Sequence, residues 1–83
     1  MTQDQIDQCV QERNAAFLSL DEERIREYMI KWNGVDLPSN PDTFWASVHK
    51  AITAVKDLPI NFRRQSKKYL TDRGMHSLDD GDL

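Results

Sequence analysis

The chain has 83 residues, of which 39% are hydrophobic and 30% charged, and its formal net charge is −3. This length allows one small core, and the composition is typical of a folded globular protein rather than a disordered one. The lone cysteine, Cys9, excludes an internal disulfide, and no apolar run reaches the length of a membrane span. The polar start, residues 1–5, does not have the form of a signal peptide. These features predict a cytoplasmic protein with no membrane partner.

Hydrophobic spacing predicts two helices in the first half of the chain, over about residues 3–18 and 20–33. Ile6 and Phe17 belong to one apolar stripe that recurs at the helical period. Ser19, with a glutamate three residues later, has the form of a capping box and predicts the start of the second helix. The glycine at position 34 ends that helix, because glycine accepts the left-handed conformation of a helix stop.

The second half of the chain predicts two more helices, over about residues 41–56 and 58–73. Asn40-Pro41 has the form of a helix start, since proline fits the first helical position and asparagine caps the free amides. Asp57 is expected to cap the last helix, so the turn before that helix is short. The last two helices are therefore expected to pack as a hairpin or as a steep corner.

The predicted fold is an all-α, small four-helix domain that spans residues 1–83. A crossing segment over residues 34–40 joins two antiparallel helix pairs. Gly74 ends the last helix, since glycine is the common residue just past a helix end. Residues 76–83 form a partly ordered acidic tail that contains Asp79, Asp80 and Asp82.

The charge is divided unevenly along the chain. Residues 1–40 hold four basic and eight acidic side chains, a net charge of −4. Residues 49–74 hold seven basic and two acidic side chains, a net charge of +5. This asymmetry predicts two surfaces of opposite sign, each a candidate for binding a partner.

An acidic pole is predicted in the second helix. It consists of Asp21, Glu23 and Glu27, together with Ile30, an apolar residue expected to lie outside the core. Such a surface is a candidate for docking on a basic surface of a protein partner. Helix capping and solubility account for the acids more simply.

A basic cluster is predicted on the last helix, where Arg63, Arg64, Lys67 and Lys68 are spaced to form one patch and are expected to face mostly outward. With Asn61, this helix and the one before it match a helix-turn-helix outline, in which the second helix enters the major groove of DNA. Three features favour an ordinary solvated helix face instead. The pI is about 5.2, the turn lacks a glycine, and the acidic first half of the chain would repel DNA.

No catalytic, metal-binding or cofactor-binding pattern is present in the sequence. Cys9, His49 and His76 do not stand at the spacing of metal ligands, and His49 has no obvious partner. Residues 79–82 contain acids and a glycine but lack the pattern of a calcium loop, and are expected to be a solvated tail. We therefore predict a protein that is not an enzyme and that holds no metal or cofactor.

The segments 44–51 (FWASVHKA), 58–63 (LPINFR), 70–74 (LTDRG) and 77–83 (SLDDGDL) resemble short uncharacterised helical proteins of Gram-positive prophages and conjugative elements. The resemblance covers about residues 22–83. It implies a protein of a phage or mobile element, a class that includes small acidic inhibitors such as anti-CRISPR proteins. It implies no role for any single residue.

The leading hypothesis is a non-enzymatic binding protein that inhibits or regulates a host or element protein of unknown identity through the acidic pole. The alternative is a small DNA-binding regulator that uses the basic helix over residues 58–73. A third possibility is a homodimer, in which a seam containing Ile30 buries that side chain.

Overall fold

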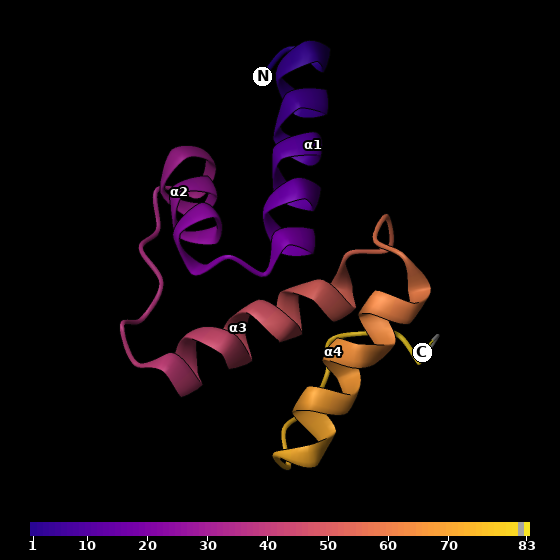
Figure 1. Cartoon of the computed structure of the whole chain (residues 1–83). Coiled ribbons are helices and arrows are strands. Elements are labelled where there is room, and N and C mark those ends of the chain that lie inside the picture. The colour runs from indigo at the N-terminus through magenta and orange to yellow at the C-terminus, as the bar shows by residue number, and fades with distance from the viewer. Residues whose placement is uncertain (82) are drawn as a thin grey trace. The chain divides into compact units, whose positions relative to one another are not determined.

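The computed structural model describes residues 1–81 and 83, and it contains four helices and no strand within those residues. The helices are α1 (Gln3–Ser19), α2 (Glu22–Asn33), α3 (Pro41–Ala54) and α4 (Ile60–Asp72) (Figure 1). The predicted all-α, four-helix class is therefore confirmed. The chain divides into two compact units, which we name unit 1 (residues 1–37) and unit 2 (residues 38–83). A single domain over the whole chain stays a prediction.

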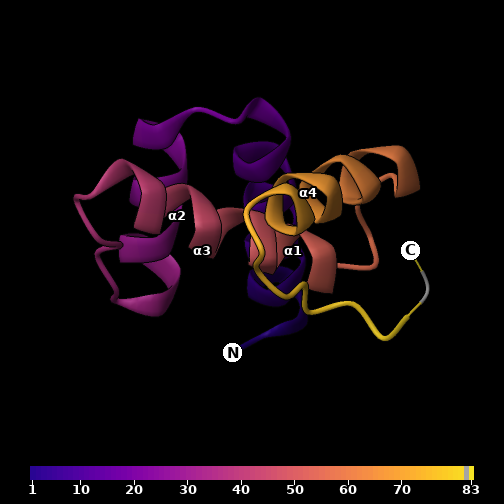
Figure 2. The same cartoon turned by 90° about the horizontal axis from the view of Figure 1, so that it is seen from below.

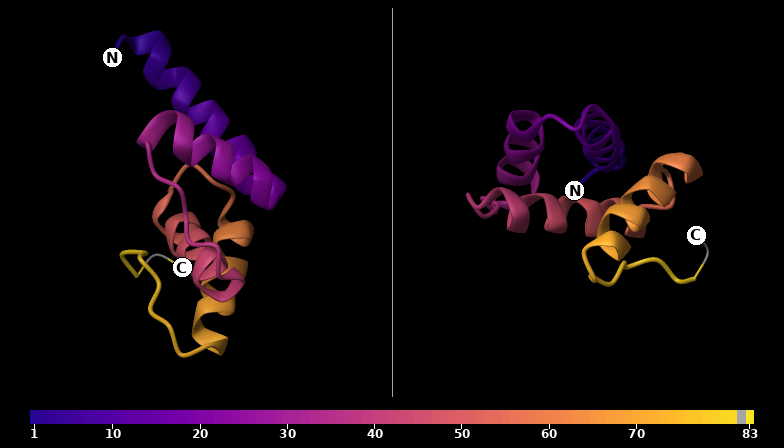
Figure 3. Two further views of the ribbon diagram at one scale, coloured as in Figure 1. Left: turned by 90° about the vertical axis from the view of Figure 1, so that its left-hand side faces the viewer. Right: turned by 60° about the horizontal axis from the view of Figure 1, so that its bottom comes forward.

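Unit 1 consists of α1 and α2, which run antiparallel (Figure 3). Thr2 caps α1 through a capping box in which it exchanges hydrogen bonds with Gln5. The rings of Phe17 and Tyr28 meet edge to face, with 6.2 Å between their centroids. Phe17, Ile25 and Tyr28 are all buried. Burying each of these side chains stabilises the fold by about 1.5–3 kcal/mol.

The N-terminal half of α1 departs from the expected stripe. Residues 1–8 are all exposed, and Ile6 is 43% accessible, so the predicted apolar stripe is not buried at this end of the helix. The reason is length, because α1 has 17 residues and α2 has 12. At 1.5 Å per residue, the shorter helix leaves several ångströms of its partner uncovered.

The junction between α1 and α2 also differs from expectation, because Ser19 does not cap α2. The Ser19 hydroxyl donates to the Ala16 carbonyl at 2.6 Å, so Ser19 is the last residue of α1. Serine side chains form such bonds to the preceding turn readily, and this bond competes with capping. Leu20 then takes a left-handed conformation, with φ of 50°, and Asp21 becomes the cap of α2. The second helix thus begins at Glu22 instead of residue 20.

Unit 2 is built on α3 and α4, which cross steeply (Figure 3). The predicted start of α3 is confirmed, because Asn40 accepts from the amides of Asp42 and Thr43 and is followed by Pro41. The buried hydrophobic side chains of unit 2 are Phe44, Ala46, Val48, Ile52, Leu58 and Leu70.

The connection over residues 55–59 is longer than predicted, and α3 ends at Ala54. Leu58 is buried in it and anchors the turn to the core. The next residue, Pro59, is the N-cap of α4 and makes no side-chain capping bond. The expectation that Asp57 caps α4 is therefore wrong, because the buried Leu58 moves the helix start to residue 60.

The end of α4 is as predicted. Gly74 has φ of 70°, its amide donates to the Thr71 carbonyl at 3.0 Å, and the Met75 amide donates to the Leu70 carbonyl at 2.8 Å. These two bonds form a Schellman motif, which reverses the chain direction. Figure 2 shows the following segment turning back and running alongside α4.

Candidate binding surfaces

The outer face of α2 carries three of the four residues of the predicted acidic pole. Glu23, Glu27 and Ile30 occupy positions i, i+4 and i+7, so they form one row along the helix. All three are exposed, and Ile30 is 52% accessible. The row lies opposite the buried face of the helix, which includes Ile25 and Tyr28. The structure therefore brings together two carboxylates and an unburied apolar side chain.

Asp21 has a different position from the rest of the acidic pole. It is the N-cap of α2, and its carboxylate accepts from the Arg24 amide at 3.2 Å. A side-chain cap of this kind contributes about 1 kcal/mol to a helix. Changing Asp21 would therefore weaken the helix that presents the pole, and Asp21 is unsuitable for testing a binding role.

A groove between α1 and α2 lies beside the row and has a volume of about 350 Å³. Its lining residues are Glu12, Ala15, Ala16, Arg24, Glu27, Tyr28 and Lys31. Glu12 accepts from Lys31 Nζ at 2.9 Å and from Trp32 Nε1 at 3.2 Å. The hydrogen bond from Lys31 lowers the pKa of the Glu12 carboxyl. Within the described part of the chain, Glu27 forms no ion pair, so its carboxylate is available to a partner.

The sequence did not point to Glu12, because its partners lie 19 and 20 residues away on another helix. Cys9 lies one turn earlier on α1, is half-buried, and has its Sγ atom 3.6 Å from the Tyr28 hydroxyl. Burial and the bond to Cys9 raise the pKa of Tyr28 to about 12. The Cys9 thiol therefore packs against the neutral phenol of Tyr28, which cannot act as a base toward it.

The basic cluster on α4 is divided between two faces, and Arg63 lies on the inner one. Arg63, Ser66 and Leu70 stand at i, i+3 and i+7, and all three are buried. The Arg63 guanidinium donates from Nη2 to the Thr53 carbonyl at 2.7 Å. The expectation that Arg63 faces outward is wrong, because its position on the helix matches that of the core residues.

Lys67 is partly covered, with 33% of its side chain accessible. Its Nζ atom donates to Asp79 Oδ2 at 3.2 Å and to the Leu83 carbonyl at 3.1 Å. The other predicted residues, Asn61, Arg64 and Lys68, are exposed, as is Gln65 between them. These four form one polar face, which we name the α4 outer face.

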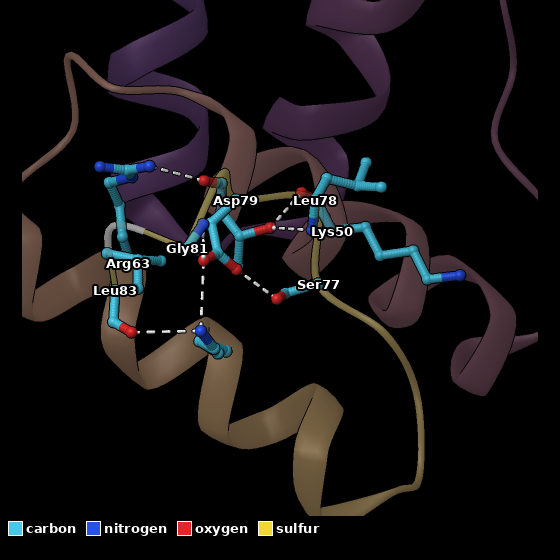
Figure 4. Close-up of polar contacts among 9 residues, drawn as sticks. Lys50, Arg63, Ser77, Leu78, Asp79, Gly81 and Leu83 are labelled. Carbon is cyan, nitrogen blue, oxygen red and sulfur yellow. Dashed lines mark hydrogen bonds and ion pairs between the residues drawn. The ribbon is translucent and has the colours of Figure 1, made fainter.

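The segment after α4, which we name the tail (residues 76–81 and 83), is attached to the rest of unit 2 by polar contacts (Figure 4). Only 2% of the Asp79 side chain is accessible, and its carboxylate accepts from Ser77, from Lys67 and from the Gly81 amide at 3.0 Å. The hydrogen bond from Ser77, followed by the contact with Lys67, lowers the pKa of Asp79 to about 2. The expectation of a solvated Asp79 is therefore wrong.

Two further contacts attach the tail. The Leu78 amide donates to Thr53 Oγ1 at 3.0 Å, and Lys56 pairs with Asp80 at 3.2 Å. The sequence did not predict these bonds, because they join segments 24 or more residues apart. Asp82, the third acid of the predicted tail, lies outside the described residues.

His49 has a partner that the sequence did not reveal. Its Nδ1 atom lies 2.8 Å from Ser66 Oγ, and its ring stacks on Tyr69 with 4.0 Å between centroids. Arg73 covers the Tyr69 ring, with 3.6 Å between its Cζ atom and the ring centroid. Burial and the charge of Arg73 lower the pKa of His49. Histidine and serine are the pair used in nucleophilic catalysis, but Ser66 is only 1% accessible, so a substrate cannot reach its hydroxyl.

Two further kinds of feature are absent from the described residues. They contain no group of three or more His, Cys, Asp or Glu side chains placed to hold a metal ion. Within the same part of the chain, every helix is too short or too polar to cross a membrane. Comparison with protein-family models, curated proteins and solved structures finds no match for this chain. The two exposed surfaces are therefore the basis for inferring a function.

Proposed function

We propose that this protein is a non-enzymatic binding protein of a phage or mobile element that acts in the cytoplasm. It inhibits or regulates a host or element protein by docking the acidic pole on it. The observation that supports the proposal is the exposed row of Glu23, Glu27 and Ile30 on α2. Unit 1 holds four basic and eight acidic side chains, so its net charge of −4 reinforces the negative sign of the row.

The chemistry of the row defines the partner surface that fits it. Two carboxylates one turn apart match a surface of lysine or arginine side chains, and attraction between the two surfaces speeds their encounter. Ile30 fits an apolar depression at the centre of such a surface, where excluding water slows dissociation. The 350 Å³ groove beside Glu27 offers room for a side chain that flanks the contact.

The test is affinity capture from a bacterial host lysate, with and without nuclease, followed by mass spectrometry. The bait is the wild-type protein, the variant Glu23→Lys/Glu27→Lys, or the control Asp7→Lys/Asp72→Lys. The control changes the net charge equally at two exposed positions that do not belong to the row. We expect one protein that resists nuclease, is recovered by the wild type and the control, and is lost with Glu23→Lys/Glu27→Lys. A companion variant, Ile30→Ser, should weaken the same complex and increase its dissociation rate.

Equal recovery by all the baits would contradict the proposal. Circular dichroism of each variant checks that the helices are intact. Because Asp21 is left in place, the cap of α2 is the same in every bait. Loss of binding therefore reports on the row and not on unfolding.

A second function is supported by a separate observation, the α4 outer face. Asn61, Arg64, Gln65 and Lys68 are exposed together on one side of the helix. These side chains are the types that bond base edges and phosphates in DNA complexes. The second candidate is therefore a small regulator that binds DNA. It predicts that Arg64→Ala/Lys68→Ala reduces the affinity for duplex DNA and flattens its dependence on salt. Affinity that is unchanged in that variant would contradict it.

A further inference from the structure

We infer that the tail covers an anion-binding surface on unit 2, and that the phosphates of a nucleic acid compete with the tail for Lys67 and Lys56. The inference rests on the second candidate function and goes beyond it. It assigns to the tail the role of an intramolecular competitor, and it adds two lysines to the surface that binds nucleic acid.

The carboxylate of Asp79 is held by the tail itself and by α4. Its carboxylate is almost fully covered and accepts three hydrogen bonds, one of them from Lys67 (Figure 4). Ser77 and Gly81 belong to the tail itself, so Lys67 is the residue of α4 that this carboxylate engages. Lys67 also donates to the Leu83 carbonyl at 3.1 Å. Two oxygen atoms of the tail therefore accept hydrogen bonds from the Lys67 ammonium group.

Lys67 borders the α4 outer face. It lies three residues after Arg64 and next to Lys68, both of which are exposed. Side chains three residues apart on a helix are neighbours. When Asp79 withdraws, Lys67 therefore joins Arg64 and Lys68 in one group of three cations. Lys56, released from Asp80, adds a fourth cation just before the helix.

The tail is attached mainly by polar contacts. Leu78 is 57% accessible, so more than half of this apolar residue lies outside the contact. The pair of Lys56 and Asp80 is exposed, with 64% and 78% of the two side chains accessible. Salt and competing anions weaken contacts of this kind, whereas they do not weaken hydrophobic packing.

The chemistry of the tail identifies the competitor. Asp79 and Asp80 are adjacent carboxylates, and each engages a different lysine. A ligand that replaces both must present two or more negative groups at once, which a single small anion does not do. The phosphate backbone of a nucleic acid presents such a row of charges and gains entropy by releasing its counterions.

The experiment measures the affinity for a fluorescent duplex of about 20 base pairs at salt concentrations from about 50 to 300 mM. It compares the full-length wild type with Asp79→Asn/Asp80→Asn and with the control Asp4→Asn/Asp7→Asn. The control removes the same charge from an exposed part of α1. In the wild type, salt weakens the tail's ion pairs with Lys56 and Lys67 as well as the phosphate contacts that replace them, so the two effects offset each other, whereas the tail variant gains about two phosphate contacts without this offset. The slope of log affinity against log salt should therefore steepen by about 1.8 in the tail variant. The control should keep the wild-type slope.

Two further measurements separate competition from a purely structural effect of the tail. Adding Lys56→Ala/Lys67→Ala to the tail variant should restore the wild-type slope, which a structural effect alone would not do. In the wild type, saturating duplex should speed hydrogen exchange at the Leu78 amide, because its bond to Thr53 is lost.

The outcomes distinguish the competition from the second candidate function. Binding only by the tail variant, or a steeper slope in that variant, supports the competition. Wild-type binding that depends on Arg64 and Lys68 but has the same slope in all three proteins overturns the inference and leaves the second function standing. No binding by any of the proteins overturns both. Displacement of the tail by an acidic protein, but not by DNA, would also overturn the inference.

Discussion

Arg63 and Arg64 are neighbours with the same side chain and opposite surroundings. Arg63 is 4% accessible and bonded to the Thr53 carbonyl, whereas Arg64 is exposed. A helix turns by about 100° per residue, so adjacent residues face different sides of it. The buried guanidinium satisfies a backbone carbonyl near the end of α3 and therefore links the two helices of unit 2.

This difference predicts the effect of replacing each arginine by alanine. Arg63→Ala should lower the free energy of unfolding by about 1.5–3 kcal/mol, because a buried carbonyl loses a charged donor. Arg64→Ala should change it by less than about 0.5 kcal/mol, as is usual for exposed positions. Urea unfolding followed by circular dichroism measures both values. Similar losses in the two variants would mean that Arg63 does not link α3 and α4 in this way.

His49 predicts a dependence of stability on pH. Its pKa lies below the usual value of 6.5 because the residue is half-buried and the charge of Arg73 is nearby. Below about pH 6.5 the unfolded chain binds this proton more readily than the folded chain, so stability falls as the pH decreases. At higher pH the contribution of His49 is constant.

Thermal unfolding at pH values between about 5 and 8 tests this effect. The wild type should have a flat melting temperature above about pH 7 and a decreasing one below about 6.5. The variant His49→Gln retains a group that can bond to Ser66 but has no proton to gain, so its melting temperature should decrease less. Equal decreases in the two proteins would assign the effect to other groups.

The junction between α1 and α2 contains strained backbone. Leu20 has φ of 50°, a conformation that costs a residue with a side chain about 1–2 kcal/mol. Leu20 is 43% accessible, so it contributes limited packing. Leucine at this position is explained by neither backbone preference nor burial.

Leu20→Gly should therefore stabilise the protein by about 0.5–1 kcal/mol, since relief of strain exceeds the entropy that glycine adds to the unfolded chain. The control Ala15→Gly places a glycine within α1 and should destabilise by about 1 kcal/mol. Chemical denaturation measures both. Destabilisation by Leu20→Gly would show that the exposed leucine makes contacts that outweigh its strain.

The tail should detach from α4 in acid. The pKa of Asp79 is lowered from 3.8 to about 2, so the contribution of its charged form is complete above pH 3.8 and is lost as the pH falls toward 2. Hydrogen exchange at the Leu78 amide, corrected for its intrinsic pH dependence, should show protection decreasing across this range. Asp79→Asn should show no such transition. Protection that persists at about pH 2 in the wild type would mean that the Leu78 bond does not depend on Asp79.

The sequence predicted the elements better than their ends. Asn40-Pro41 and Gly74 were identified correctly because their effect is local and depends on backbone conformation. The predictions that Ser19 and Asp57 are helix caps are wrong, because a cap also depends on which hydrogen bonds form nearby and on which neighbouring side chains are buried. The Ser19 hydroxyl bonds back to α1, and the burial of Leu58 shifts the start of α4. The tail contacts were missed because they join residues far apart in the sequence.

The two units differ in net charge. Unit 1 has a net charge of −4, and unit 2 has seven basic and six acidic side chains, a net charge of +1. The sequence located the acidic row on α2, since Glu23, Glu27 and Ile30 follow a helical spacing. It overestimated the basic surface, because burial of Arg63 and pairing of Lys67 depend on how α3, α4 and the tail pack.

The two surfaces belong to different units, so their binding functions should respond to different substitutions. Glu23→Lys/Glu27→Lys should abolish capture of the protein partner without lowering the affinity for DNA. Arg64→Ala/Lys68→Ala should have the opposite effect. For both variants, affinity capture measures binding of the protein partner and duplex titration measures the affinity for DNA. If one variant abolished both interactions, a single shared surface would have to replace the two separate ones.

Each unit also contains one of the two tryptophans, and their surroundings differ. The indole of Trp32 donates to Glu12 and lies under the Lys31 ammonium, with 5.1 Å between Nζ and the ring centroid. Trp45 meets Phe44 edge to face and lies 6.0 Å from the His49 ring. The chain thus contains two intrinsic fluorophores, one for each unit. In the variant Trp45→Phe, the fluorescence of Trp32 reports on events at the α1–α2 groove. In the variant Trp32→Phe, the fluorescence of Trp45 reports on protonation of the His49 imidazole. Neither experiment needs an added label.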